Sequence, residues 1–225
     1  MHELEKWFYC YALRENKFKF SAFGREVNKY LEDIELPNKI PEWVYSSNVE
    51  PIKTKIKKSN LPLDTVAWQY FKLDKEKGGL FTLERCKNGA SGDLLDGNDC
   101  YYLGAKKSAN SVMRRVSRED DLITKGNCIV FIGNGQGSVG YSNYMNDDFI
   151  GTADLTVGYN DHLNPFIGLF IVAVLDMERP KYSFGRKWSA RIADTKIKLP
   201  AVAQGLPDWA FMENYIKSLP YSDNL

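Results

Sequence analysis

The chain contains two long segments that repeat the same ordered set of motifs. Residues 7–43 and 169–209 each begin with an apolar stretch, continue through a basic and aromatic stretch, and then carry Phe-Gly-Arg, Leu-Pro and a proline–acid–tryptophan triplet. The spacings differ by only a few residues, as expected of two versions of one structural unit with different loop lengths. We therefore predict that residues 7–37 and 169–200 form superposable helix-then-strand units.

The second copy shows how such a unit would be built. Asn164 is a residue type favoured at a helix N-cap, and the proline after it suits the first helical position, so a helix is predicted over 165–177. The Glu-Arg-Pro sequence that follows should end this helix, because proline removes a backbone donor and restricts the residue before it. A strand is predicted near 181–184, a half-buried strand over 196–199, and a short closing helix from Pro207 onward.

Residues 64–160, between the two copies, have a different character. Aromatic and β-branched runs typical of strands lie at 66–73, 80–83, 100–103 and 127–132, and glycine- and Asp/Asn-rich turns lie at 88–92 and 96–98. We therefore predict an α+β fold, in which a β-rich mixed-sheet domain is flanked by the repeated helix–strand segments. The predicted boundaries are 1–40 for the first copy, 41–63 for a helical or linker segment, 64–206 for the β-rich domain and 207–225 for the closing helix.

The composition is that of an ordinary globular protein. Hydrophobic residues make up 44% and charged residues 26% of the chain, and no apolar run approaches the roughly 20 residues of a membrane span. The first residues carry acid and lack the apolar core of a secretory signal, so a cytoplasmic location is expected. The 4 cysteines are scattered without a CxxC pair and only 2 histidines are present, so no metal site is predicted. We expect reduced, buried structural thiols.

The net charge of +1 does not mark a nucleic-acid binder, so a basic surface would have to come from the distribution of charge. Acidic residues are absent from 51–63, 100–118 and 179–193, where lysines and arginines gather. This pattern fits either solvated faces of mixed sign or a surface that faces DNA. For the second interpretation, the predicted DNA contacts are Lys106, Lys107, Arg114, Arg115, Arg179, Lys181 and Arg186. Arg186, like Arg25 in the first copy, follows Phe-Gly and is equally explained as a structural clamp of a turn.

A glycine-rich segment, Gly135 to Gly140, matches the G-x-G-x-x-G pattern of dinucleotide-binding loops. The helix that such a loop requires is missing, and Asn164-Pro165-Phe166 lacks the second proline of a methyltransferase motif, so no cofactor is expected in this chain. We predict a turn between strands, in which glycine supplies positive φ. Its amide and hydroxyl groups suit phosphates or base edges, and the candidates are Asn134, Gln136, Ser138, Tyr141 and Asn143.

Several of these motifs occur together in a known family. The ordered set lies at 68–73, 80–81, 102–105, 123–129, 137–141, 169–170 and 196–200. With this set the chain resembles the target recognition domains of type I restriction–modification specificity subunits and the specificity regions of related type II enzymes. Residues 1–37 resemble the end of one recognition domain, and 64–200 a complete second one. The chain would then be a fragment or a half-subunit, without the long spacer helices of the family.

The resemblance implies that the chain recognises a sequence in double-stranded DNA and is not itself an enzyme. Catalysis would belong to partner methyltransferase and endonuclease subunits or domains, which would hold S-adenosylmethionine and magnesium, with or without ATP. Self-association as a half-subunit is a further option. Two other functions stay open at this stage: a protein-binding adaptor that does not touch DNA, and a metal-dependent nuclease that uses the D-x-K pattern of Asp194 and Lys196.

Overall fold

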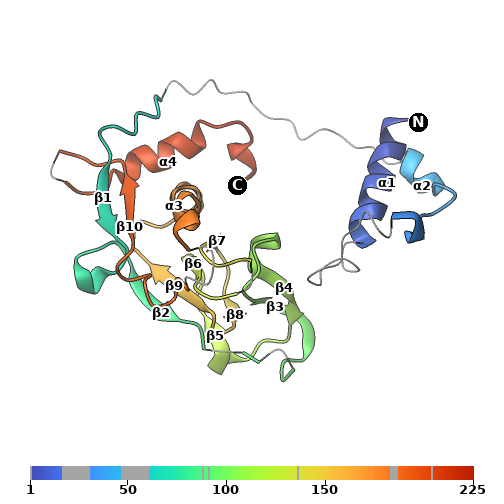
Figure 1. The fold of residues 1–225 in the computed structure, drawn as a ribbon, viewed down its shortest axis with the longest axis horizontal. Helices are drawn as coiled ribbons and strands as arrows, with labels where there is room; N and C mark the ends of the chain where they lie inside the picture. Colours follow the sequence, from blue (N-terminus) through green and yellow to red (C-terminus); the bar gives the residue numbers. More distant parts are fainter. Residues whose placement is uncertain are drawn as a thin grey trace. The chain divides into compact units, whose positions relative to one another are not determined.

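A computed structural model gives the fold of the chain (Figure 1). It describes residues 2–16, 31–46, 61–87, 89–90, 92–135, 137–182, 187–203 and 205–225. Backbone contacts divide the chain into two compact units, unit 1 (Met1–Lys53) and unit 2 (Thr54–Leu225). Within the part of the chain that is described, no helix is long and apolar enough to cross a membrane.

Unit 1 contains the helices α1 (Glu3–Glu15) and α2 (Glu42–Ser46). His2 caps the start of α1, because its N–H donates to the Glu5 carboxylate at 2.6 Å while its ring accepts the N–H of the second helical residue at 3.3 Å. The α2 helix packs on α1 through Trp43, whose ring meets the ring of Phe8 edge to face at a centroid distance of 6.5 Å.

Unit 2 is built from strands and two longer helices. The strands are β1 (Gln69–Lys72), β2 (Thr82–Arg85), β3 (Asp96–Leu103), β4 (Val112–Val116), β5 (Ile123–Thr124), β6 (Cys128–Ile132), β7 (Ser142–Met145), β8 (Phe149–Gly151), β9 (Leu155–Tyr159) and β10 (Lys196–Leu199). The helices are α3 (Pro165–Glu178) and α4 (Trp209–Lys217), and short 3-10 helices cover Lys75–Lys77, Ala109–Ser111, Asp120–Leu122, Arg179–Tyr182 and Ser222–Asn224. This architecture confirms the α+β prediction, and each of the four predicted strand runs overlaps a strand.

The strands form three sheets within the described residues. A central antiparallel sheet has the order β2-β9-β6-β7, and a mixed sheet has the order β4-β3-β8-β5, in which β3 and β8 run parallel. The third sheet is the antiparallel pair of β1 and β10. The termini of unit 2's β-rich part therefore meet, because its first strand pairs with its last.

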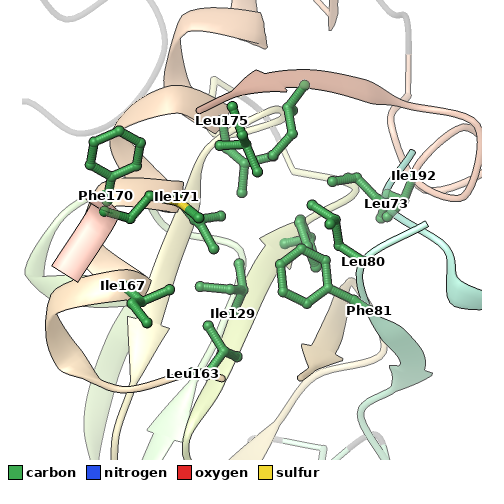
Figure 2. Close-up of a cluster of buried hydrophobic side chains, with 14 of the residues drawn as sticks. Leu73, Leu80, Phe81, Ile129, Leu163, Ile167, Phe170, Ile171, Leu175 and Ile192 are labelled. Carbon is green, nitrogen blue, oxygen red and sulfur yellow. The ribbon is translucent and has the colours of Figure 1, made fainter. Parts of the chain in front are cut away.

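Strand β6, inside the central sheet, is buried on both faces, which explains why it is an unbroken apolar run. Ile129 and Phe131 belong to the hydrophobic cluster that also contains the apolar side of α3. Val130 and Ile132 alternate to the opposite face and pack with Leu103 from the mixed sheet. Figure 2 shows the first cluster, with side chains of α3 lying close to Ile129.

The helix α3 begins where the sequence predicts, and α4 begins two residues after the predicted Pro207. The Asn164 side chain accepts a hydrogen bond from the Ile167 N–H at 3.0 Å, and Pro165 is the first residue of α3. Asp208 caps α4 in the same way, accepting from the Phe211 N–H at 2.9 Å. The two helices pack together through aromatic rings, as α1 and α2 do in unit 1. The predicted strand over 196–199 is confirmed as β10.

The strand predicted near 181–184 is wrong in its described part, because Arg179–Tyr182 form a 3-10 helix. Proline fixes φ near a value that suits this turn as well as an extended chain. The turn is held at its end by Tyr182, whose ring stacks on Trp188 at a centroid distance of 5.0 Å. Residues 183–186, which include the second Phe-Gly-Arg motif, lie outside the described residues.

The turn predicted at 96–98 is also wrong, because these residues are part of β3. Asp96 and Cys100 both lie opposite Val116, so the residues between them form a bulge in the strand. Gly97 is required at this bulge, since a Cβ there would lie 2.6 Å from the backbone nitrogen of Ser117.

The two repeat copies agree in their helices but not in their strands. The N-caps His2 and Asn164 start α1 and α3 at equivalent positions, whereas the described residues before Leu36-Pro37 contain a short 3-10 turn and no counterpart of β10. A strand needs a neighbour to satisfy its backbone groups, and β10 has one in β1. The first Phe-Gly-Arg motif, at 23–25, lies outside the described residues.

The thiols follow the prediction with one exception. Cys86, Cys100 and Cys128 are free and buried, but Cys10 is exposed on α1. Burial raises the pKa of the Cys86 thiol to about 11, which makes it a poor nucleophile.

Candidate nucleic-acid interface

The glycine-rich loop joins β6 to β7 as a hairpin. Gly135, Gly137 and Gly140 have φ values of 126°, 75° and 87°, which confirms the prediction that glycine supplies positive φ here. The next element is a strand and not a helix. The loop therefore lacks the helix N-terminus that a dinucleotide phosphate requires.

Three segments distant in sequence converge on the ring of Tyr141 at the end of this loop. Lys107, in the loop after β3, places its Nζ 5.9 Å from the ring centroid. Arg179, at the end of α3, places its guanidinium carbon 4.3 Å from the same centroid. We call these three residues the Tyr141 cluster. Both cations are exposed, and among the described residues neither is paired with a carboxylate.

The backbone beside the cluster is shaped to let Arg179 approach. Gly140 has a positive φ, and a Cβ at this position would lie 3.2 Å from Arg179 Cγ and 3.1 Å from the ring of Tyr182. A Cβ at this position would crowd both Arg179 and Tyr182, and the positive φ is one that other residues rarely adopt. The glycine thus has a packing role in addition to its role in the turn.

A carboxylate ties the hairpin to the end of α3. Asp176 Oδ1 accepts hydrogen bonds from the Ser142 N–H at 3.2 Å and from the Ser142 hydroxyl at 3.4 Å. Burial is the main cause that raises the pKa of Asp176, and the hydrogen bonds from Ser142 oppose it. This contact fixes the residue after Tyr141 to the helix turn before Arg179.

Three of the predicted contact residues instead have their polar groups engaged within the protein. The Ser138 hydroxyl donates to the Ala105 carbonyl at 2.7 Å, and Ser138 is only 3% exposed. Lys106 Nζ donates to the Val112 carbonyl at 3.1 Å, and the Asn143 amide donates to Ser111 Oγ at 2.6 Å. The bonds of Ser138 and Asn143 join the hairpin to the β3–β4 connection that carries Lys107, and the bond of Lys106 lies within that connection.

Arg114 and Arg115 lie on opposite faces of β4, because neighbouring strand residues alternate. Arg114 pairs with Asp96 and lies over the ring of Tyr102, at 5.8 Å from its centroid. Arg115 lies over the ring of Tyr101 at 4.7 Å. The structure therefore does not bring both arginines to one surface with Lys107.

The remaining predicted residues are placed differently. Asn134 is half-buried, and its Oδ1 accepts a hydrogen bond from the Ser189 hydroxyl at 3.1 Å. Lys181 pairs with Glu178, which raises the pKa of the lysine. Gln136 and Arg186 lie outside the described residues, as does most of the basic stretch over 51–63.

A second group of cations was missed by sequence reasoning. Arg85, Lys87, Arg118 and Lys125 line a hollow of about 380 Å³ together with Glu84, Asp120, Ile123, Thr124 and Tyr159. Asp148 lies beside it and pairs with Lys125 at 2.9 Å and with Arg118 at 3.6 Å, and the Gly126 N–H and Lys125 lower its pKa. Arg118 ends the acid-free stretch 100–118, but Arg85, Lys87 and Lys125 lie close to acidic residues in other parts of the sequence, so no single run of like charge reveals the group.

An ion pair with Lys77 accounts for Asp194, the acidic residue of the D-x-K pattern. Asp194 Oδ1 lies 2.6 Å from Lys77 Nζ, and this contact lowers the pKa of the carboxylate. Among the residues that the structure describes, no group of three or more His, Cys, Asp or Glu side chains is placed to hold a metal ion.

Comparison with known proteins identifies a sequence relative. No protein-family model matches the chain. The type II restriction enzyme specificity subunit S.BcgI of Heyndrickxia coagulans is 26% identical over 155 residues, which are 68% of this chain and 44% of that protein. The chain thus spans less than half the length of this relative.

Two solved structures also align with the chain. The type I S subunit from M. genitalium aligns with 68% of this chain and 38% of its own, at 18% identity and a TM-score of 0.48. The HsdS subunit from Thermoanaerobacter tengcongensis aligns with 76% of this chain and 39% of its own, at 13% identity and a TM-score of 0.47. The resemblance inferred from the motifs is confirmed by the sequence relative: the chain is similar to a restriction-enzyme specificity subunit.

Proposed function

We propose that this chain recognises a sequence in double-stranded DNA as the specificity component of a cytoplasmic restriction–modification system. The observation that carries the proposal is the Tyr141 cluster, in which two exposed cations and an aromatic ring meet at the end of a hairpin. The similarity to a specificity subunit supports it.

Each part of the cluster has a suitable chemistry. Lys107 and Arg179 would contact backbone phosphates, which fix the position of a protein on DNA but carry no sequence information. The hairpin loop would extend from this anchor toward the base edges, with Asn134 and Gln136 as the candidates for sequence readout. Methylation and cleavage would belong to partner methyltransferase and endonuclease polypeptides, which would hold S-adenosylmethionine, magnesium and, in some systems, ATP.

A salt titration of DNA binding tests the phosphate contacts. The variants Lys107→Ala and Arg179→Ala are compared with the unchanged chain by fluorescence anisotropy on a random-sequence duplex. Each lost phosphate contact should reduce the slope of log affinity against log salt by about 0.9. The matched control is Lys75→Ala, which removes an exposed lysine from the turn between β1 and β2 and should leave the slope unchanged. Unchanged slopes for both cluster variants would show that the interface lies elsewhere.

A second experiment separates sequence readout from anchoring. The preferred duplex is first selected from a randomised pool, and Asn134→Ala and Gln136→Ala are then measured on the selected and random duplexes. A lost base contact should cost about 1–3 kcal/mol on the selected duplex only. Co-purification with a methyltransferase polypeptide tests the partner. A folded chain that binds such a partner but no duplex would instead be a protein-binding adaptor.

A further inference from the structure

The connection between β3 and β4 contains a turn whose backbone has an unusual conformation. The φ values of Ala109, Asn110 and Ser111 are 52°, 49° and 66°. This left-handed conformation is costly for residues with a side chain, although asparagine tolerates it better than most. Three such residues in succession keep it only where the surrounding structure holds them in place. We call Ala109–Ser111 the left-handed turn.

Hydrogen bonds hold the left-handed turn at its buried end. Ser111 is fully buried, and its hydroxyl donates to the Lys106 carbonyl at 2.9 Å and accepts from the Asn143 amide at 2.6 Å. The Gly104 N–H donates to the Ser111 carbonyl at 3.0 Å, and the Ser111 N–H donates to the Ser108 carbonyl at 3.2 Å. These contacts fix the turn against β7, the strand that follows the glycine-rich loop.

The left-handed turn presents Asn110 to solvent. Residues 107–110 are exposed in succession, whereas Ser111 is buried. The Asn110 side chain makes no hydrogen bond with any part of the chain that the structure describes. Asn110 follows Lys107 by three residues, and Lys107 lies over the ring of Tyr141. A free carboxamide is therefore carried by the same connection as one cation of the Tyr141 cluster.

The carboxamide of Asn110 has the chemistry needed to identify a base. It offers a donor and an acceptor side by side, which match the N7 acceptor and the N6 donor of adenine in the major groove. A side chain on a backbone that is already fixed loses less conformational freedom on binding than one on a mobile loop. Strained backbone conformations are concentrated at functional sites, where they position a side chain before the ligand arrives. The left-handed turn thus gives Asn110 a rigid support.

We propose that Asn110 is a specificity-determining residue of the interface and contacts an adenine of the recognised duplex in the major groove. This assignment rests on the proposed function and adds to it a readout residue on the β3–β4 connection, separate from the glycine-rich loop. Lys107 would hold a neighbouring phosphate and so set the position of Asn110 along the duplex.

Replacing Asn110 with glycine removes the carboxamide and keeps a residue that adopts left-handed backbone freely. The preferred duplex is selected from a randomised pool with the unchanged chain, and fluorescence anisotropy measures binding to the selected and random duplexes. Asn110→Gly should weaken binding to the selected duplex about 5-fold to 150-fold and leave binding to the random duplex unchanged. The matched control is Ala109→Gly, which places glycine in the same turn without removing a polar group and should keep the full preference.

A modified base identifies the adenine. Each adenine of the selected duplex is replaced in turn by 7-deazaadenine, which lacks the N7 acceptor. One of these replacements should weaken binding by the unchanged chain and have no further effect on Asn110→Gly, because the contact that it removes is already absent. Asn110→Asp also tolerates left-handed backbone, but it replaces the amide donor with an acceptor and should lose the preference for that adenine.

Three results would overturn the assignment of Asn110. These are a glycine variant that keeps the preference, a glycine variant that loses affinity equally on both duplexes, and a control variant Ala109→Gly that loses the preference to the same extent. Urea unfolding checks that each variant is folded, and Asn110→Asp carries the test if Asn110→Gly is not. If the unchanged chain selects no duplex, the proposed function fails as well, whereas a chain that selects a duplex without using Asn110 contradicts only the role of this residue.

Discussion

Thr195 is the centre of a buried hydrogen-bond network, and its removal should destabilise unit 2 in a way that can be calculated. Its Oγ1 accepts from Trp188 Nε1 at 2.9 Å, lies 3.0 Å from the Tyr182 hydroxyl, and donates to the Arg191 carbonyl at 2.8 Å. Trp188 is fully buried and Thr195 is 7% exposed. The variant Thr195→Val keeps the shape of the side chain but leaves the indole N–H without its partner.

The expected cost follows from the groups left unpaired. A buried polar group without a partner costs about 1–3 kcal/mol, and the change affects both the Trp188 N–H and the Tyr182 hydroxyl. We therefore expect Thr195→Val to lower the free energy of unfolding by about 2–6 kcal/mol. Thr195→Ser keeps the hydroxyl and loses one methyl group, which should cost about 1 kcal/mol.

Urea unfolding followed by far-ultraviolet circular dichroism measures both variants against the unchanged chain. The valine variant should also bind DNA more weakly than the serine variant, because Tyr182 belongs to the same 3-10 turn as Arg179. The reasoning is refuted if the valine variant is as stable as the serine variant. In that case the Thr195 hydroxyl would stabilise the fold no more than the Thr195 methyl group does.

Three further predictions concern other sites. Gly140→Ala should lower the free energy of unfolding by about 1–2 kcal/mol, because alanine is strained at positive φ, and a thermal melt checks this effect. The same variant should weaken DNA binding by crowding Arg179, which the anisotropy titration checks. Native thiol labelling should modify Cys10 rapidly and the three buried cysteines only on unfolding, so a second fast thiol would contradict the burial described above. Burial raises the pKa of Asp176 above the value in the unfolded chain, so the stability that protonated Asp176 contributes should be fully present below the unfolded pKa and should fall as pH rises through the folded pKa. The variant Asp176→Asn should lack this pH dependence when unfolding is measured across acidic pH.

Local signals in the sequence predicted the elements that they specify directly. Asn164-Pro165 defined the start of α3, and the apolar and β-branched run at 127–132 predicted the strand β6. The prediction of a strand near 181–184 was wrong in its described part because tertiary contacts of Tyr182 hold a helical turn that the local pattern does not specify. The prediction of a turn at 96–98 was wrong because a bulge accommodates the turn-forming residues Asp-Gly-Asn inside a strand.

The candidate site could be predicted only in part. Tyr141, Lys107 and Arg179 were each expected to contact DNA, but their meeting at one ring depends on strand pairing and on the packing of α3, which no sequence spacing encodes. The separation of Arg114 from Arg115 follows from strand alternation once β4 is known. A basic stretch in a sequence therefore needs its secondary structure before it can be interpreted as a surface.

The pairing of β1 with β10 has a consequence for how this protein can be exchanged or rearranged. Gln69 lies opposite Leu199, so the chain enters and leaves the β-rich part at neighbouring points. A segment with adjacent ends can be replaced as a cassette, because the flanking chain meets the same two anchor points whatever lies between them. Recombination between related genes at these two positions would therefore transfer the whole hairpin, its supporting loops and α3 at once. For the same reason, a circular permutant that joins the two ends and opens the chain at an exposed turn should still fold.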